Sequence, residues 1–456
     1  MRNHEKVKDM KRILKKLTPP QILTIGFIVI ILLGSFLLML PFMHQNHQSI
    51  HFSDAIFTAV SATTITGLTT LPTATTWTIP GQLVLMLMIE IGALGFMTFA
   101  VLIFTITGHH LDLKSRILAQ QSLNLKNLSD INSILSYVLR LSAVIQLLGI
   151  LFLSFDFVPR YGWKQGLYFS LAHSVSSFAN AGFVFFKTPF SQFADDPYVL
   201  IVTMILILAG SLGFLVWRDL LLKGQKTRMT LHTRLTLTVS GWLIALGFVG
   251  FFTSDFMRGT FANGHSLFNQ IIDTLFLTIT PRTAGFEIVP TTSLSTAGIM
   301  ALIALMFIGG TPGSTSGGIK TTTAGILIAQ VWASLRGQDS VRFGDRQFSK
   351  KTVNKALMLV VISFIFVFLV SFILSITETL PKGSGLEYYV FEVVAAFSTA
   401  GLSLGLTPHL TMAGKIIIMI VMFIGRVGLY TVMFSVLNVR IQDTHYEYPE
   451  EEVLIG

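Results

Sequence analysis

The sequence predicts an all-α membrane protein made of four pseudo-repeats, in which eight spanning helices surround a central pore. Its 456 residues are 52% hydrophobic and only 12% charged, whereas soluble domains carry about a quarter charged residues. A glycine followed by a bulky apolar residue recurs at Gly67, Gly182, Gly285 and Gly401. These glycines are separated by 115, 103 and 116 residues. Such a long and nearly fixed period indicates that the whole architecture repeats.

Each repeat is expected to contain two long apolar helices. The first long helices fall over residues 21–41, 131–158, 231–256 and 352–377, and the second over 81–108, 197–222, 296–335 and 413–438. A run of roughly 20 apolar residues crosses the hydrocarbon core of a bilayer. The run at 21–40 is longer than the apolar part of a signal peptide, and no small-x-small cleavage site follows it. We therefore interpret it as a retained transmembrane helix.

A short amphipathic segment separates the two long helices of every repeat. These segments lie at 54–62, 164–176, 267–279 and 388–396. With 9 to 13 residues each, they are too short to span the bilayer. Non-helical backbone at membrane depth persists only inside protein or beside water. We therefore expect the short helices to dip into the membrane and return, with the glycine segments lining a wet cavity.

The distribution of charge defines the expected topology. A basic N-terminus occupies 1–20, the pore repeats occupy 21–108, 131–222, 231–335 and 349–438, and the C-terminus occupies 439–456. The two termini and the three connecting loops hold 22 Lys and Arg residues, against six in the glycine-bearing segments. The positive-inside rule then places both termini in the cytoplasm of a multi-pass protein of the cell (inner) membrane. The net charge of +9 is thus mainly topological, and nucleic-acid binding is not expected.

Composition also limits the chemistry. The chain has no cysteine, which excludes disulfides, thiolate metal sites and a cysteine nucleophile. No nucleophile–base pair and no carboxylate pair suited to hydrolysis stands out in the sequence. We therefore expect neither an enzyme nor a covalent cofactor.

The four glycine segments are typical of an ion filter. A cation that loses its water needs a ring of oxygens, which backbone carbonyls from several segments can supply. Glycine allows such a segment to turn its carbonyls inward and adds no side chain to the pore. The expected filter residues are Thr64, Ile65, Thr66, Gly67, Ala179, Asn180, Ala181, Gly182, Arg282, Thr283, Ala284, Gly285, Ser398, Thr399, Ala400 and Gly401. Glycines in plain interhelical turns are the structural alternative.

The third repeat interrupts its second long helix. Residues 309–320 place five glycines and a proline inside an apolar span, where a continuous helix does not persist. We expect an intramembrane gate beneath the filter, with a static helix break as the alternative. A phosphate-binding loop is disfavoured because Ile319 separates glycine from lysine. The expected gate residues are Gly309, Gly310, Thr311, Pro312, Gly313, Ser314, Thr315, Ser316, Gly317, Gly318, Lys320 and Arg426.

Several charged residues lie in apolar surroundings. Arg426 is a lone charge in a membrane span, and such charges face a cavity or a partner. It is expected to act as a positive barrier or latch near the gate loop, or as a structural arginine bonded to loop carbonyls. Arg282 is expected to support the filter from behind. Asp54 either caps its short helix or attracts cations, and Glu392 could be a buried partner.

A second row of glycines follows the first. It comprises Gly92 and Gly95, Gly210 and Gly213, Gly310 and Gly313, and Gly425 and Gly428. Small residues let helices approach closely in lipid. Outside the third repeat, we expect this row to serve helix packing.

These residues resemble those of the Trk/Ktr/HKT superfamily of potassium transporters, and most closely the membrane subunit of the bacterial Ktr system. The resemblance covers Thr18-Pro19-Pro20-Gln21, the four filter segments, the gate loop and Met422-Phe423-Ile424-Gly425-Arg426, and Thr280-Pro281-Arg282-Thr283-Ala284-Gly285-Phe286 is especially characteristic. The chain departs from the family pattern at Ala179, where asparagine is common, and at Pro312, which stiffens the gate loop.

The resemblance implies channel-like K⁺ uptake, with K⁺ bound by the filter carbonyls and Na⁺ dependence in many members. It also implies a homodimer in the lipid bilayer and a cytosolic ring of RCK-type regulatory subunits. Nucleotide (ATP/ADP or NAD) would act only through that partner. An alternating-access secondary transporter, with the broken third-repeat helix as its substrate site, is the main alternative. A membrane sensor or scaffold that does not transport is another.

Overall fold

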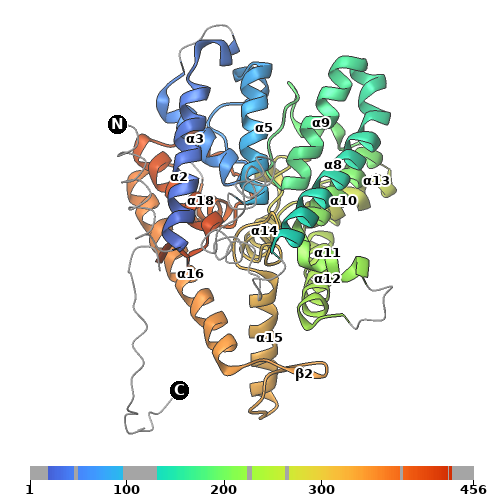
Figure 1. Cartoon of the computed structure of the whole chain (residues 1–456), viewed down its shortest axis with the longest axis vertical. Coiled ribbons are helices and arrows are strands. Elements are labelled where there is room, and N and C mark those ends of the chain that lie inside the picture. Colours follow the sequence, from blue (N-terminus) through green and yellow to red (C-terminus); the bar gives the residue numbers. More distant parts are fainter. Residues whose placement is uncertain are drawn as a thin grey trace.

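The computed structural model describes residues 19–45, 50–95, 131–222, 229–261, 266–380, 384–429 and 431–433. In this part the chain is mostly helical, and Figure 1 shows helices from distant parts of the sequence lying side by side. The predicted basic N-terminus up to residue 18, the loop at 109–130 and the C-terminus at 439–456 lie outside the described residues. So do the last parts of two predicted helices, at 96–108 and 434–438.

Four helices are long and apolar enough to cross a membrane. They are α2 (Pro19–Leu38), α8 (Ile131–Tyr161), α12 (Leu231–Phe251, continued by the π-helical turn η5, Phe252–Phe256) and α16 (Lys350–Thr377). They confirm the predicted first long helices to within a few residues. Large apolar side chains on them, such as Leu33, Leu147 and Phe368, are 60–64% exposed. Apolar side chains on the outside of a helix are expected where the helix faces lipid.

Four short helices run from the surface into the interior. They are α3 (Phe52–Thr63), α9 (Trp163–Ala179), α13 (Leu267–Ile279) and α17 (Leu386–Ser398). Their first residues are 45–71% exposed. Their last turns are buried, since Ala62, Phe178, Ile279 and Ser398 are at most 3% exposed. The predicted short helices are therefore present, and each ends inside the protein.

Within the described residues, the second long helices end or break, in three repeats at points where the sequence predicted that they would continue. They are α5 (Ile79–Leu94), α10 (Pro197–Ser211) with α11 (Phe214–Leu222), α14 (Thr296–Phe307) with α15 (Thr321–Leu335), and α18 (Met412–Val427). The break between α14 and α15 was predicted, but the expectation of one continuous helix over 197–222 is wrong. There α10 and α11 meet at a bend of 98°. Counted with this bent pair, up to five spans are found among the described residues by length and composition.

The second glycine row explains where these helices end. The backbone of Gly95, Gly213 and Gly428 has a φ of +80° to +94°, a region that glycine enters at little cost and that ends a helix. At the bend, the Phe214 amide donates to the Gly313 carbonyl at 3.0 Å. The bend thus places α11 against the interrupted segment of the third repeat.

The other member of each glycine pair allows close packing. A methyl group built on Gly92, Gly210 or Gly425 would overlap a main-chain carbonyl oxygen, that of Thr63, Phe178 or Phe397 respectively. These carbonyls belong to the last turns of α3, α9 and α17. Glycine at these positions therefore lets each second helix touch the end of the short helix before it, as predicted for a packing role.

Carboxylates join the first long helix to the second in two repeats. Asp255 accepts a hydrogen bond from the Ser295 amide at 2.7 Å, and Glu378 accepts one from the Thr411 amide at 2.8 Å. Ser295 and Thr411 are the N-cap residues of α14 and α18. A carboxylate at a helix N-terminus is stabilising.

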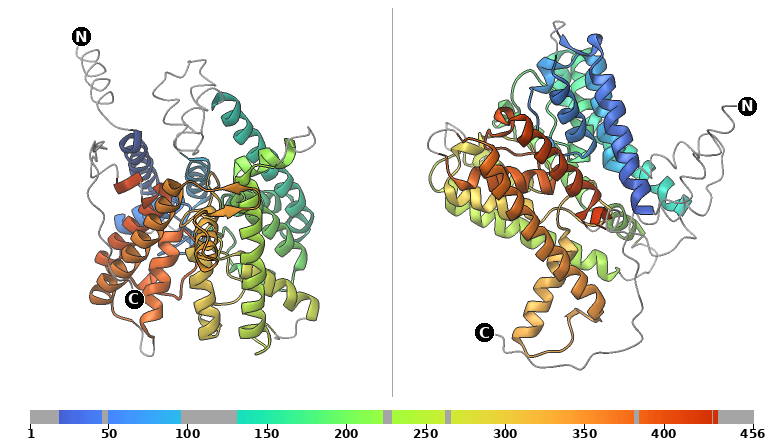
Figure 2. Two further views of the ribbon diagram at one scale, coloured as in Figure 1. Left: turned by 90° about the horizontal axis from the view of Figure 1, so that it is seen from below. Right: turned by 90° about the vertical axis from the view of Figure 1, so that its left-hand side faces the viewer.

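The remaining elements are small. They are η1 (Pro41–Met43), α4 (Thr73–Thr76), η3 (Phe190–Phe193), η6 (Thr291–Ser293), η7 (Thr407–His409), β1 (Arg342–Phe343) and β2 (Arg346–Gln347). The two strands pair antiparallel, with Arg342 opposite Gln347, and join α15 to α16. Figure 2 shows this helix pair projecting beyond the other helices. A 2.7 Å ion pair between Arg234 and Asp345 ties the hairpin to α12.

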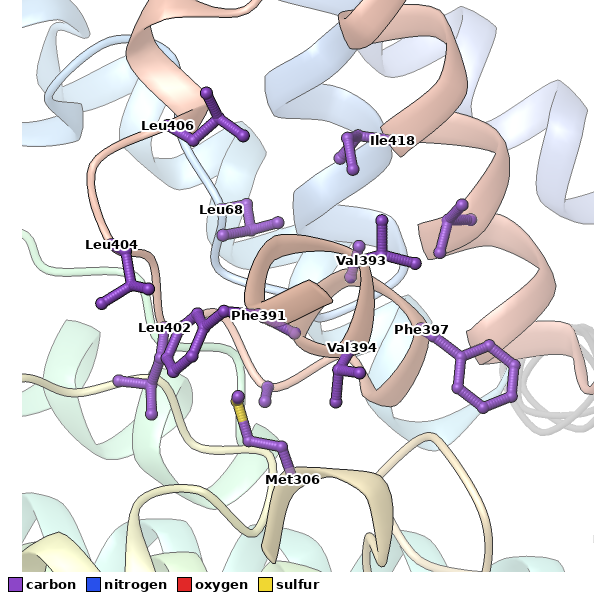
Figure 3. Packing of buried hydrophobic residues seen from close by; sticks show 14 of the residues in the cluster. Leu68, Met306, Phe391, Val393, Val394, Phe397, Leu402, Leu404, Leu406 and Ile418 are labelled. Atoms are coloured by element: carbon purple, nitrogen blue, oxygen red, sulfur yellow. The ribbon is translucent and has the colours of Figure 1, made fainter. Parts of the chain in front are cut away.

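The largest apolar cluster surrounds α17 (Figure 3). Phe391 and Phe397 of this helix pack with Leu68 and Leu402, the residues that follow two of the repeated glycines, and with Met306 of α14. Burying such a side chain contributes about 1.5–3 kcal/mol. The cluster holds a short helix in the middle of the protein, where its carboxyl end meets the ends of the others.

We expect Gly210→Ala to destabilise the protein by about 1–3 kcal/mol, because the added methyl group overlaps the Phe178 carbonyl and the packed neighbours must move. Gly241→Ala is the matched control, since Gly241 lies in α12 and a methyl group there meets no atom within 4 Å. Thermal unfolding of the purified protein in detergent should show a lower midpoint for Gly210→Ala alone. Equal midpoints would contradict this packing account.

Candidate functional site

The four repeated glycines form a closed ring. A methyl group built on Gly67 would lie 3.2 Å from the Cα atom of Gly182. The distance from a built methyl group to the Cα atom of the next glycine is also 3.2 Å for Gly182 to Gly285, Gly285 to Gly401, and Gly401 to Gly67. The nearest atom in each case is the carbonyl oxygen of the residue before the next glycine (Ala181, Ala284, Ala400 and Thr66). Four backbone segments therefore meet in chain order, with no space for a side chain between them.

The ring glycines have a left-handed backbone. Their φ values are +88°, +68°, +70° and +78° in chain order, a region that β-carbon-bearing residues enter only at a cost. Substitution at any of them is therefore opposed twice, by the backbone conformation and by the neighbouring segment.

The residue two positions before each ring glycine is also left-handed. Among the described residues, positive φ values outside glycine occur at Ile65, Asn180, Thr283 and Thr399, at +51° to +75°. Three of the four are β-branched, for which this conformation is a genuine outlier. Such strain, of order 1–3 kcal/mol per residue, persists only where surrounding contacts enforce it.

The ends of the short helices enforce this conformation in three repeats. The Thr66, Ala181 and Ala400 amides each donate to the carbonyl five residues earlier, at 2.8–2.9 Å. This is the bond of a Schellman motif, which ends a helix with a left-handed residue. In the third repeat, whose turn contains Pro281, the pattern is shifted by one residue. The Ala284 amide donates to the Thr280 carbonyl at 2.9 Å, and the Gly285 amide donates to the same carbonyl, five residues earlier, at 3.4 Å.

Side chains brace two of the segments from behind. The Ser176 hydroxyl donates to the Phe183 carbonyl at 2.8 Å, and the Thr280 hydroxyl donates to the Phe286 carbonyl at 2.8 Å. In the first segment, the hydroxyl oxygens of Thr64 and Thr66 lie 2.8 Å apart. The bulky residues after the ring glycines are at most 2% exposed, so each segment is fixed against the protein on its outer side.

The interrupted segment of the third repeat lies against these segments. It connects α14 to α15 and contains the predicted gate residues from Gly309 to Lys320. The remaining predicted gate residue, Arg426, lies in α18. A methyl group on Gly309 would lie 3.5 Å from the Thr283 methyl, and one on Gly318 would lie 3.1 Å from the Ser398 Cα atom. The Asn180 side chain is 3.0 Å from the Thr315 hydroxyl and 3.2 Å from the Ser316 hydroxyl. The segment thus contacts three of the four parts of the ring.

A ladder of backbone bonds holds the segment in place. The Gly309 amide donates to the Ile319 carbonyl at 2.9 Å, and the Thr321 amide donates to the Gly310 carbonyl at 3.0 Å. The Thr311 amide donates to the Ser211 carbonyl at 3.1 Å, beside the bend between α10 and α11. Together with the side-chain contacts of Thr311, Thr315 and Ser316, these bonds hold the segment against the ring without a regular helix or strand.

Two cations bind carbonyls of this segment. Arg426 donates to the Thr315 carbonyl, and also to the Gly92 carbonyl and, at 3.1 Å, to the Ala93 carbonyl of α5. The Lys320 ammonium donates to the Ser316 carbonyl at 2.6 Å. Arg426 therefore joins the segment to the first repeat, as expected for either a latch or a structural arginine.

Comparison with known proteins identifies the family. The family described as TrkH, cation transport protein, matches residues 8–445 of this chain. The chain belongs to the TrkH family of cation transport proteins. This confirms the resemblance predicted from the filter and gate residues.

Two bacterial uptake proteins match over nearly their whole length, and one solved structure matches over most of it. The chain is 41% identical to the potassium/sodium uptake protein NtpJ of Enterococcus hirae, over 98% of this chain and 99% of that protein. It is 40% identical to the Ktr system potassium uptake protein B of Bacillus subtilis, over 97% of each. The crystal structure of the potassium transporter TrkH from Vibrio parahaemolyticus superimposes with a TM-score of 0.70 at 18% identity, over 91% of this chain and 83% of that one, and shows the same fold.

Arg282 of this TrkH-family chain is deeply buried beside the ring. Its side chain is 1% exposed, and one terminal nitrogen donates to the Ser240 hydroxyl of α12 at 3.0 Å. Its Nε and other terminal nitrogen meet no acceptor among the described residues. The guanidinium thus reaches α12, and its predicted role in supporting the filter stays a prediction.

Carboxylates contact the chain just after the ring glycines. Asp54 of α3 accepts from the Thr70 hydroxyl at 2.8 Å and from the Lys415 ammonium of α18 at 2.6 Å. Glu392 of α17, which is fully buried, accepts from the Ser403 hydroxyl at 3.0–3.1 Å and from the Thr407 hydroxyl. Asp54 thus pairs with a cation, and Glu392 is held by hydroxyl groups.

Sequence reasoning missed one acid at the ring. Glu287 follows Gly285 by two residues, and it accepts from the Thr291 hydroxyl at 2.8 Å and from the Ser403 amide at 3.5 Å. Ser403 occupies the same position after Gly401. Alignment of the four glycines would have shown that this position is acidic in the third repeat alone, with Thr69, Val184 and Ser403 in the others.

We expect Arg426→Gln to lower the free energy of unfolding by about 1–3 kcal/mol, because shortening and neutralising the side chain leaves buried carbonyls without donors. Arg346→Gln, an exposed arginine on β2, is the control and should not change stability. Thermal unfolding of both variants in detergent is the measurement. An unchanged midpoint for Arg426→Gln would show that the contacts of Arg426 do not stabilise the fold.

Proposed function

We propose that the chain mediates channel-like K⁺ uptake across the cell membrane, with the ion passing through the ring of Gly67, Gly182, Gly285 and Gly401. The observation that carries this proposal is the closure of four backbone segments in chain order, each presenting a carbonyl oxygen to its neighbour. The names of the two bacterial relatives, a potassium/sodium uptake protein and a potassium uptake protein, support K⁺ as the ion.

The chemistry required is the replacement of water by fixed oxygens. Backbone carbonyls can replace the hydration shell of K⁺ when they are held in place. The left-handed residues and the Schellman bonds hold them here. The carboxyl ends of the four short helices point inward, and their partial negative charge favours a cation. In this proposal the four filter segments are those expected from the sequence.

The interrupted segment of the third repeat serves as the gate. It lies against three filter segments and blocks the pathway until it moves. Arg426 and Lys320 place positive charge there, which opposes a cation while the segment is in place. The same charges argue against the alternating-access alternative, since a cation substrate site at this segment would lie beside two positive side chains.

The family resemblance and the distribution of charge support four further features: the number of spans, the topology, the Na⁺ dependence and the partners. We infer four pore repeats with eight spans and both termini in the cytoplasm, supported by the four short helices and the Lys and Arg distribution. Na⁺ dependence is supported by the sodium in the name of one relative. A homodimer and a cytosolic RCK-type ring that brings nucleotide control are inferred from the resemblance alone.

Uptake of radiolabelled rubidium into proteoliposomes tests the proposal, with K⁺ or Na⁺ as competitor. We expect K⁺ to block uptake and Na⁺ to spare it. Gly285→Ser should lower this discrimination by about tenfold or more, the equivalent of 1.4 kcal/mol, because a serine Cβ would lie 2.7 Å from the Ala400 carbonyl oxygen. Gly241→Ser, where the added atoms meet open space, is the control.

Two results would count against the filter. Equal competition by K⁺ and Na⁺ in the unmodified protein would exclude a K⁺-selective pore. Unchanged discrimination in a folded Gly285→Ser variant would exclude the ring as the selective element. A folded protein without uptake would contradict autonomous transport, and uptake restored by a cytosolic extract would assign the missing step to a regulatory partner.

A further inference from the structure

Asn180 connects the filter to the gate segment, which is the interrupted segment of the third repeat at residues 309–320. It is the left-handed residue of the second filter segment and is fully buried. Its side chain lies 3.0 Å from the Thr315 hydroxyl and 3.2 Å from the Ser316 hydroxyl. These two residues lie 135 and 136 positions further along the chain. The contact therefore joins two separate parts of the pathway directly.

The orientation of the amide follows from its surroundings. With the amide oxygen toward Thr315 and Ser316, the oxygen accepts from both hydroxyls, and the amide nitrogen donates to the Ser177 carbonyl at 3.2 Å and the Ile207 carbonyl at 3.2 Å. The opposite orientation would place the oxygen against these two carbonyls. Because buried polar groups are hydrogen-bonded, we assign the first orientation.

Asn180 thus joins three elements at one point. Ser177 belongs to the last turn of α9, Ile207 to α10, and Thr315 and Ser316 to the gate segment. An asparagine that only ended a helix would need no contact beyond its own turn. Here both the nitrogen and the oxygen of the amide make hydrogen bonds, and the gate segment supplies the donors to the oxygen.

The equivalent residues of the other segments make no such bond. Thr283 and Thr399 face the gate segment, but their hydroxyls have no hydrogen-bond partner among the described residues. Ile65 has no polar side-chain group. Of the four left-handed residues, Asn180 is the one through which the gate segment can hold a filter segment by hydrogen bonds.

We propose that Asn180 is a positioning residue that makes ion selectivity depend on the position of the gate segment. While Thr315 and Ser316 bond its amide oxygen, the second filter segment is fixed in the shape that presents its carbonyls to the ion. When the gate segment leaves, the oxygen loses both donors and this filter segment is held less firmly. By thermodynamic reciprocity, a filter in the binding shape favours the docked gate segment. This proposal rests on the filter and gate roles proposed above.

A double-mutant cycle in proteoliposomes tests the coupling. Asn180→Gly removes the amide and keeps a residue that tolerates positive φ. Thr315→Val with Ser316→Ala, called the loop variant below, removes both hydroxyls with little change in volume. It also removes the 3.3 Å bond from the Thr315 hydroxyl to the Phe178 carbonyl. Rubidium uptake is measured for its rate and for its discrimination between K⁺ and Na⁺ as competitors.

We expect each arm of the cycle to raise the rate and lower discrimination by about fivefold, the effect of losing roughly 1 kcal/mol of hydrogen bonding. The combined variant should resemble either arm alone, because the same contact is already lost. Ser314→Ala is the control for damage to the segment: its hydroxyl donates to the Thr311 carbonyl at 2.7 Å and accepts from the Ser316 amide at 3.3 Å, but makes no bond to Asn180. It should leave discrimination unchanged, whatever its effect on rate.

Three results would overturn the coupling. If Thr315→Val with Ser316→Ala changes the rate of rubidium uptake but keeps full discrimination between K⁺ and Na⁺, the gate is independent of the filter. Additive effects in the combined variant would show that the two sites act separately. Equal loss of discrimination in Ser314→Ala would show general damage to the segment. If Asn180→Gly does not fold, the comparison of the loop variant with Ser314→Ala still decides.

The test separates this proposal from the proposed function. An unmodified protein that does not prefer K⁺ refutes the filter itself, before any variant is compared. An unmodified protein that prefers K⁺, with a loop variant that prefers it equally, refutes only the coupling through Asn180.

Discussion

The structure depends on one steric constraint, the meeting of four backbone segments with no room for a β-carbon between them. Each ring glycine lies against the carbonyl oxygen that precedes the next glycine. For the segments to meet in this way, four short helices must end at the same place, and the chain must turn sharply after each. The left-handed residues and the Schellman bonds are the means of that turn. The glycines of the second row, which let the second helices touch the ends of the short ones, serve the same arrangement.

Charge is divided between the two sides of this ring. The acids Asp54, Glu287 and Glu392 contact residues that follow the ring glycines, and Asp54 is paired there with Lys415. On the other side, Lys320 and Arg426 bind the segment that lies against the residues preceding the glycines. We interpret this as an attractive entrance and a guarded exit for a cation. Fixed charges on either side of a narrow passage act over several ångströms and set the direction in which ions are concentrated. The acids lie mainly in the third and fourth repeats, so the entrance is asymmetric although the ring is nearly regular.

Length and hydropathy predicted the long helices because burial in lipid requires a continuous apolar run. They did not predict the bend between α10 and α11, since 197–217 carries no charged residue that would mark a break. The bend depends on Gly213 and on a bond to Gly313, 100 residues further along the chain. The left-handed Ile65, Thr283 and Thr399 were not predictable either, because β-branched residues disfavour that conformation. Of the four left-handed positions outside glycine, only Asn180, a residue type that tolerates this conformation, carried a local signal. The ring glycines were predicted because their period was visible in the sequence, but their contacts were not.

The most direct test of the account is to locate the ion. A structure of the purified protein in thallium or rubidium salt would show by anomalous scattering where the permeating cation binds. We expect density on the axis of the ring, within coordination distance of the carbonyls of Thr66, Ala181, Ala284 and Ala400. Density beside the unwound segment between α14 and α15, with none at the ring, would contradict the four-glycine filter and support a substrate site in the broken helix.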